Sequence, residues 1–149
     1  MSATVYTHSA SETISLGKKI GRLLKGGDII AFKGGMGMGK TTITHGIAMG
    51  MGLRDDVSSP TFALVNEYSG DGALTLYHFD MYRISGADEL ESIGFYDYLS
   101  DGCAAVIEWS ENIADELPPD AIIIQIEKTG ENDRKITISG GDRFDGIGN

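Results

Sequence analysis

The sequence predicts an α/β fold, in which a mixed β-sheet is flanked by helices and extended by antiparallel hairpins. Two short apolar runs, at residues 28–33 and 103–109, are typical of buried strands, and the first leads through a glycine-rich loop into a helical segment. Two further pairs of strand-like runs are each joined by a short turn of glycine and polar residues, which is the pattern of a hairpin. Helix-linked strands combined with hairpins imply a mixed sheet covered by helices.

The elements can be assigned in order along the chain. Residues 9–12, Ser-Ala-Ser-Glu, fit a capping box and predict a helix to about Lys25, which Gly26 and Gly27 end. After the strand at 28–33 and its glycine-rich loop, a helix is expected from Lys40 to about Met51. The later expected elements are a hairpin of 62–68 with 74–80, a broken helix at 85–99, a strand at 103–109, and a hairpin of 121–127 with 135–139.

Length and composition favour one folded domain. The 149 residues predict a single domain over residues 1–139, followed by a flexible glycine-rich tail at 140–149. A content of 41% hydrophobic and 23% charged residues excludes a wholly disordered chain. Cys103 is the only cysteine, which excludes a disulfide within the chain. We expect a cytoplasmic protein without membrane contact, because the polar first residues carry no signal peptide and no apolar run is long enough for a membrane helix.

The net charge of −10 is unevenly distributed. Residues 1–54 hold seven bases and two acids, whereas residues 55–120 hold fifteen acids and one base, Arg83. Autonomous nucleic-acid binding is disfavoured, because phosphate neutralisation requires clustered Lys and Arg. For Arg83 two interpretations stay open, a salt bridge to a nearby acid or a contact with a partner or a nucleotide.

The strongest motif is a phosphate-binding loop. Residues 34–41, Gly-Gly-Met-Gly-Met-Gly-Lys-Thr, match G-x-x-x-x-G-K-[ST] without a mismatch, between a strand and a helix as the motif requires. Glycine allows the backbone N–H groups to face phosphate oxygens, and the helix N-terminus adds its positive dipole end. Lys40 can reach the β- and γ-phosphates, and the Thr41 hydroxyl can ligate Mg²⁺. The loop therefore predicts a P-loop NTPase-like fold that binds a nucleoside triphosphate with Mg²⁺.

Two carboxylates are candidates for holding the metal. Glu108 and Asp80 each end a strand-like run, and α/β sheets bind ligands at the carboxyl ends of their strands. A P-loop site uses such an acid to hold Mg²⁺, although either residue can also be a solvated side chain at a strand end. Trp109, which follows Glu108, is open to a packing or a functional role. His78 is expected to be structural.

Other nucleotide-dependent functions remain as alternatives. A small-molecule kinase requires arginines that clamp the transferred phosphoryl group, and the five arginines of this chain are not clustered. A nucleotide-gated binding module would bind the nucleotide without useful hydrolysis. A GTPase is disfavoured because neither N-K-x-D nor T-K-x-D occurs.

Several motifs in a fixed order resemble the bacterial TsaE (YjeE) family. They are the phosphate loop with Thr41-Thr42, Ser59-Pro60-Thr61-Phe62, Asn66-Glu67-Tyr68, His78-Phe79-Asp80-Met81-Tyr82-Arg83, Glu89-Leu90 and Ile107-Glu108-Trp109-Ser110. The resemblance runs from the first helix to the last strands. It implies an ATPase needed to make threonylcarbamoyladenosine in tRNA, weak by itself and stimulated by its partners, the TsaD and TsaB proteins. Contact with tRNA would be indirect, through that complex.

The resemblance also implies roles for individual residues. Lys40 and the loop amides would hold the triphosphate, while Thr41 and Glu108 would ligate Mg²⁺. Asp80 would act at the metal or on the attacking water, and Thr61 would belong to a nucleotide-sensing switch. The implied nucleotide-binding residues are Gly35, Met36, Gly37, Met38, Gly39, Lys40, Thr41, Thr42, Ser11, Arg134 and Trp109, with Ser9 to Ser11 and Arg134 close to the adenosine.

One departure from the family pattern lies within the loop. The family usually reads G-D-L-G-A-G-K-T, whereas here Gly35 replaces the acid, and Met36 and Met38 replace leucine and alanine. The glycines, the lysine and the threonine of the motif are kept, so we expect phosphate binding to survive. Met38 places a bulkier side chain close to the phosphates.

Overall fold

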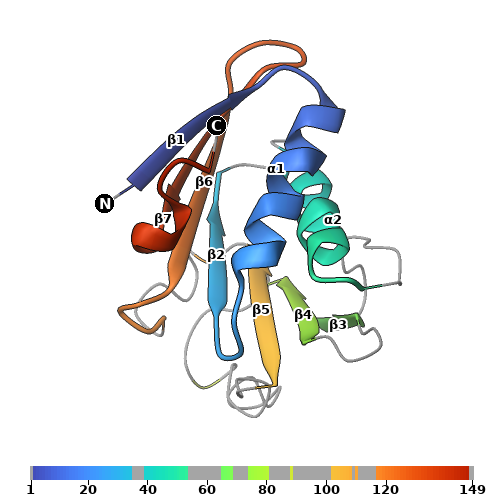
Figure 1. Ribbon diagram of the computed structural model, residues 1–149, viewed down its shortest axis with the longest axis vertical. Helices are drawn as coiled ribbons and strands as arrows, with labels where there is room; N and C mark the ends of the chain where they lie inside the picture. The colour runs from blue at the N-terminus through green and yellow to red at the C-terminus, as the bar shows by residue number, and fades with distance from the viewer. Residues whose placement is uncertain are drawn as a thin grey trace.

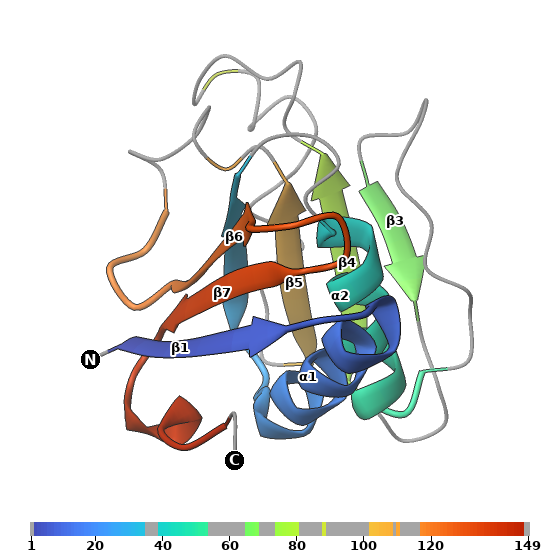
Figure 2. The same ribbon diagram turned by 90° about the horizontal axis from the view of Figure 1, so that it is seen from above.

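A computed structural model describes residues 2–34, 39–53, 65–68, 74–80, 88, 102–108, 110 and 117–147. These residues form a seven-stranded sheet of order β1-β7-β6-β2-β5-β4-β3, with two helices side by side on one face (Figures 1 and 2). The elements are β1 (Ser2–Thr7), α1 (Ala10–Leu23), β2 (Ile29–Lys33), α2 (Lys40–Gly50), β3 (Val65–Tyr68), β4 (Thr75–Asp80), β5 (Cys103–Glu108), β6 (Ile122–Lys128), β7 (Arg134–Ser139) and the 3₁₀ helix η3 (Asp142–Phe144). The helix expected at 85–99 falls outside the described residues, apart from Asp88.

The sheet is mixed, which confirms the predicted fold class. Strand β2 pairs in parallel with β5 and with β6, and β4 pairs in parallel with β5. Both predicted hairpins are present, because β3 is antiparallel to β4 and β6 is antiparallel to β7. The parallel strands bring their carboxyl ends to one edge, where Lys33 ends β2, Asp80 ends β4 and Glu108 ends β5.

Both helices and the sheet face beneath them share one hydrophobic core. Its buried members include Leu16, Ile20, Ile43 and Ile47 from the helices and Ile30, Phe32, Leu76 and Val106 from the strands. Alternate residues on the opposite face, such as Ile29, Ala31 and Ile107, are buried too. Central strands of a parallel sheet are buried on both faces, which explains the continuous apolar runs in the sequence. No helix in the described part of the chain is long and apolar enough to span a membrane.

Helices α1 and α2 cross with their backbones in direct contact. A Cβ at Gly17 would lie 2.5 Å from the Ile43 carbonyl oxygen, and one at Gly46 would lie 2.3 Å from the Ile14 carbonyl oxygen. Real Cβ atoms do not approach backbone atoms this closely, so the crossing requires glycine. Gly21 and Gly50 make an equivalent contact one turn further along. The helix glycines therefore set the distance between the two helices.

Strand β1 is an element that the sequence does not predict. It pairs antiparallel with β7 along its whole length, from Ser2 opposite Ser139 to Thr7 opposite Arg134. The inward positions Ala3, Val5 and Thr7 alternate with exposed ones, but only one of them is strongly apolar. This weak alternation explains why propensity alone does not reveal the strand.

Residues 140–147 lie against the core, whereas their glycine content predicts a flexible tail. Phe144 is 1% exposed, and Ile147 belongs to the same hydrophobic core. Arg143 binds the Asp28 carboxylate through both of its terminal nitrogens, each at 2.8 Å, and also donates to the Leu23 carbonyl. One buried aromatic ring and one bidentate ion pair order this segment despite its glycines.

Candidate functional site

The N-terminus of α2 forms the phosphate end of the site. Its N-cap, Gly39, has a φ of 105°, in the left-handed region that favours glycine, and no side chain among the described residues caps it. Lys40 is the first residue of the helix and is 7% exposed, and the first turn carries no acid. Free amides at a helix N-terminus bind anions. The start of α2 at Lys40 agrees with the prediction, while Gly35, Met36, Gly37 and Met38 fall outside the described residues.

A polar pocket opens beside that helix end, and three elements build it. They are the first turn of α1, the first turn of α2 and the loop between β6 and β7. The lining residues are Ser9, Ala10, Thr13, Gly39, Thr42, Glu131, Asn132 and Arg134. The N-terminal ends of two helices therefore face one cavity, which adds two positive dipole ends to it.

The pocket brings distant parts of the chain together. Ser9 and Arg134, expected near the adenosine, line the same cavity as Gly39 and Thr42 at the phosphate end. Ser11 is not among the lining residues and is exposed on the first turn of α1. The structure thus places Ser9 and Arg134 in the same pocket as Gly39 and Thr42, whereas Ser11 does not line the pocket.

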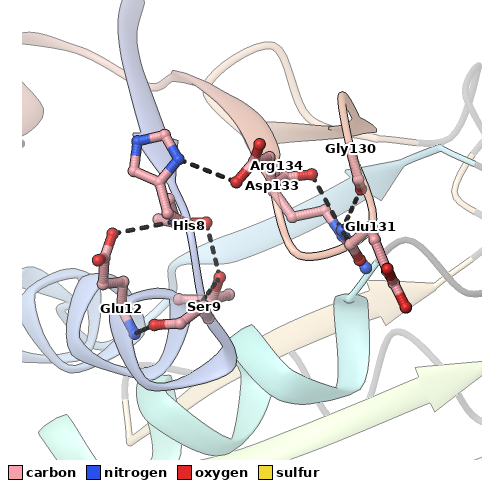
Figure 3. A network of polar contacts seen from close by, with 9 residues as sticks. His8, Ser9, Glu12, Gly130, Glu131, Asp133 and Arg134 are labelled. Carbon is pink, nitrogen blue, oxygen red and sulfur yellow. Dashed lines mark hydrogen bonds and ion pairs between the residues drawn. The ribbon is translucent and has the colours of Figure 1, made fainter.

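The α1 wall is fixed by its cap. The Glu12 amide donates to the Ser9 hydroxyl at 3.1 Å, as the capping-box pattern predicts. The Glu12 carboxylate accepts from the His8 amide at 3.0 Å, one residue earlier than the pattern requires (Figure 3). The Thr13 and Thr7 hydroxyls meet at 2.8 Å and tie the end of β1 to the first turn of α1.

Arg134 organises the hairpin wall. Its Nη1 donates to the carbonyls of Gly130, Glu131 and Asp133 at 3.3, 3.3 and 2.9 Å, so the loop closes around the guanidinium (Figure 3). Its Nε would lie 3.9 Å from a Cβ at Gly39. The side chain therefore extends from the hairpin to the N-cap of α2, which brings a cation to the N-terminal end of that helix.

A second contact joins the hairpin to α1 across the solvent-facing side. His8 Nδ1 lies 3.0 Å from Asp133 Oδ1 (Figure 3). This hydrogen bond, helped by the negative charges of Asp133 and Glu12, raises the pKa of His8 above its ordinary value of 6.5. Both side chains are well exposed, at 64% and 49%, so solvent screens the contact.

Glu108 lies at the carboxyl edge of the sheet, where the sequence expects a metal ligand. It ends β5 and is 8% exposed. The chain just after it is anchored to the end of β2, because the Ser110 hydroxyl donates to the Phe32 carbonyl at 2.8 Å. Buried His78 on β4 approaches the carboxylate, with its Nε2 3.3 Å from Glu108 Oε2. A nearly buried carboxylate oxygen and the Thr41 hydroxyl are hard donors of the kind Mg²⁺ takes together with substrate phosphates.

The other expected site residues are only partly described. The register places Asp80 on β4 directly opposite Glu108 on β5, and the Asp80 side chain lies outside the described residues. Thr61, Trp109 and Arg83 also lie outside them. The expectations for these four side chains remain predictions.

Sequence reasoning missed several residues of the site. Thr13, Glu131 and Asn132 line the pocket, yet a helix position and a turn loop carry no sequence signal for binding. One indirect signal pointed to these positions. The family resemblance implies that Arg134 and residues 9–11 both lie close to the adenosine, so their neighbours were candidates for the same pocket. His78 stands in a matched motif but was expected to be structural.

The sequence and the structure both resemble known proteins. A family model described as "Threonylcarbamoyl adenosine biosynthesis protein TsaE" matches residues 7–136. A protein of Bacillus subtilis named "tRNA threonylcarbamoyladenosine biosynthesis protein TsaE" is 37% identical over 140 residues, covering 93% of this chain and 87% of its own length. A protein of the same name from Aquifex aeolicus is 40% identical over 136 residues, covering 90% and 93%. The crystal structure of Bacillus subtilis YdiB superposes with a TM-score of 0.77 at 30% identity, covering 99% of this chain and 91% of that one.

Proposed function

The chain belongs to the TsaE family, and from this premise we propose that it is a Mg²⁺-dependent ATPase. Its hydrolysis of ATP supports the formation of threonylcarbamoyladenosine in tRNA by driving the cycle of a partner transferase complex in the cytoplasm. The observation that carries the proposal is the pocket in which Arg134 and the first turn of α1 meet the N-terminus of α2 beside Lys40.

Within this proposal, each wall of the pocket has a separate task. The α2 amides and Lys40 would hold the phosphates, and the Thr41 hydroxyl and Glu108 would hold the Mg²⁺. The first turn of α1 and the β6–β7 loop take the adenosine, with the Arg134 guanidinium between adenosine and phosphates. Bound Mg²⁺ supplies charge neutralisation at the phosphates, and Asp80 acts at the metal or on the attacking water.

The partners follow from family resemblance and are consistent with the charge distribution. TsaD and TsaB are the proposed partners, and the transfer to tRNA takes place on TsaD. Residues 55–120, with fifteen acids against one base, repel tRNA phosphates, so this chain meets tRNA through the complex. Weak ATPase activity of the isolated chain is expected, because a switch ATPase is completed by its partner.

Reconstitution of tRNA modification with the partner proteins tests the proposal. We expect the wild type to support many turnovers and Lys40→Ala to support few or none. Full multi-turnover modification by the variant contradicts the proposal. Measuring ATP turnover with and without partners separates an ATPase from a nucleotide-gated binding module, and a phosphorylated small molecule formed from labelled ATP would instead identify a kinase.

A further inference from the structure

His78 is a fully buried polar side chain near the proposed metal site. It is 0% exposed in the middle of β4, and neither of its ring nitrogens has a hydrogen-bond partner among the described residues. Its Nε2 lies 3.3 Å from Glu108 Oε2, which is close enough for an ion pair. The angle between the two groups does not meet the criteria for a hydrogen bond. Buried polar atoms are almost always satisfied, so this exception calls for an explanation.

The sheet register puts both side chains on the helix-bearing face. His78 pairs with Val106 across β4 and β5, and Glu108 follows Val106 by two residues. Because side chains alternate along a strand, Glu108 and His78 share the face of Val106, which belongs to the core packed under α1 and α2. The imidazole therefore lies next to the Glu108 carboxylate, on the face of the sheet against which α2 packs.

Packing alone does not account for a histidine at this position. An apolar side chain of similar size would fill the same space without burying two nitrogens that find no partner in the described part of the chain. A ring N–H beside a carboxylate has a different use, because ligating carboxylates are held in orientation by hydrogen-bond donors behind them. Glu108 can take such a hydrogen bond through a small rotation, since its Oε2 is already within 3.3 Å.

We propose that His78 is a positioning residue of the metal site, whose ring holds the Glu108 carboxylate in the orientation that binds the Mg²⁺ of the bound nucleotide. The inference rests on the proposed function, because it takes Glu108 as a metal ligand. It adds a residue that acts behind that ligand and touches neither metal nor nucleotide.

Matched substitutions of His78 test the inference. His78→Gln keeps an amide N–H near the place of Nε2, while His78→Asn reaches only the place of Nδ1, and His78→Leu has no donor. The readout is the Mg²⁺ dissociation constant in the presence of ADP, obtained from binding of a fluorescent ADP derivative at increasing Mg²⁺. Binding of the same derivative in EDTA, where no metal is present, reports whether the pocket itself is intact.

We expect the Asn and Leu variants to bind Mg²⁺ about 10- to 100-fold more weakly, with ADP binding in EDTA unchanged. The Gln variant should stay close to the wild type, which a purely structural role of the ring would not produce. Wild-type Mg²⁺ affinity in the Asn or the Leu variant, if that variant still binds ADP, overturns the inference. Equal losses in all three variants overturn it as well.

Glu108→Gln, measured in the same way, separates this inference from the proposed function. If Glu108→Gln weakens Mg²⁺ binding and the Asn and Leu variants of His78 do not, the positioning role fails while Glu108 remains a ligand. If Glu108→Gln leaves Mg²⁺ binding unchanged, the assignment of Glu108 as a metal ligand fails, and the role of His78 fails with it.

Discussion

The two walls of the pocket are held by different kinds of interaction. The helix wall, formed by the first turns of α1 and α2, is fixed by a backbone crossing that admits only glycine at Gly17 and Gly46. The hairpin wall, formed by the β6–β7 loop, is held by the Arg134 hydrogen bonds and by the exposed contact between His8 and Asp133. The first kind is insensitive to solvent conditions, while the second responds to pH and salt.

This difference separates two requirements of a nucleotide site. Phosphates and metal need donors at fixed places, because preorganised charge stabilises the transition state without rearrangement. In the proposed function, the adenosine side has to admit and release a large ligand, and a loop held by a few polar contacts can do so. The predictions below act on one wall at a time, from the largest expected effect to the smallest.

Lys40→Ala removes the cation of the helix wall without changing the helix crossing. Hydrogen bonds to charged groups contribute about 1.5–3 kcal/mol, so ATP should bind about 10- to 100-fold more weakly. Equilibrium dialysis with labelled ATP measures the loss. Lys25→Ala, an exposed position after α1, is the matched control and should bind as the wild type does. Equal affinities for the two variants would remove Lys40 from the phosphate site.

Gly46→Ala disrupts the packing of α2 against α1 in the helix wall. The added Cβ would lie 2.3 Å from the Ile14 carbonyl oxygen and 3.0 Å from the Gly17 Cα, so the helices must move apart. Overpacking of this kind costs about 1–3 kcal/mol in the free energy of unfolding, which urea denaturation measures. At Gly102 a Cβ would meet nothing within 4 Å, and Gly102→Ala serves as the control. A Gly46→Ala protein as stable as the control would show that the crossing tolerates a side chain.

Arg134→Ala loosens the hairpin wall and leaves the helix wall intact. The loop loses three hydrogen bonds to its carbonyls, and the pocket loses a cation. We expect ADP affinity to fall about tenfold, corresponding to about 1.4 kcal/mol, while the free energy of unfolding changes little. Isothermal titration calorimetry measures the affinity, and Lys135→Ala at the next position is the control. A loss of stability without a loss of affinity would limit Arg134 to a structural role.

The smallest expected effect is a pH dependence of the hairpin wall through His8. Its pKa in the folded protein is raised by the hydrogen bond to Asp133, so protonated His8 stabilises the wall. This stabilisation is fully present below the ordinary pKa of 6.5 and is lost as the pH rises through the raised folded-state value. ADP affinity of the wild type should therefore decline modestly over that range, and more at low salt. His8→Ala should give a flat profile, and a decline that persists in this variant would assign the effect to another group.

The helix starts that form the helix wall could be predicted from sequence, because local signals specify them. The motif fixed Lys40 at the start of a helix, and the capping box fixed the start of α1 at Ser9. The parallel pairing of β2 and β5 agrees with their apolar runs, and the end of β5 at Glu108 agrees with the expected carboxylate at the strand end. The two helix starts and the two apolar runs each depend on residues close together in the chain.

The hairpin wall could not be derived in the same way. Its position depends on the long-range pairing of β1 with β7, which places Thr7 opposite Arg134. The close crossing of α1 and α2 at their glycines could not be predicted either. A glycine within a helix does not indicate which residue of another helix packs against it. Arg134 was expected near the nucleotide only from the family resemblance, because no residue pattern in the sequence indicates it.

The pairing of β1 with β7 has a consequence for the order of folding. Thr7 lies opposite Arg134, so the first strand finds its partner only after nearly the whole chain has been synthesised. Contacts this distant in sequence are slow to form, since a long loop must close before they add stability. A nascent chain that ends before β7 already contains β2 and the phosphate-binding start of α2, but not the Arg134 wall. The pocket that Arg134 lines is therefore completed only late in synthesis.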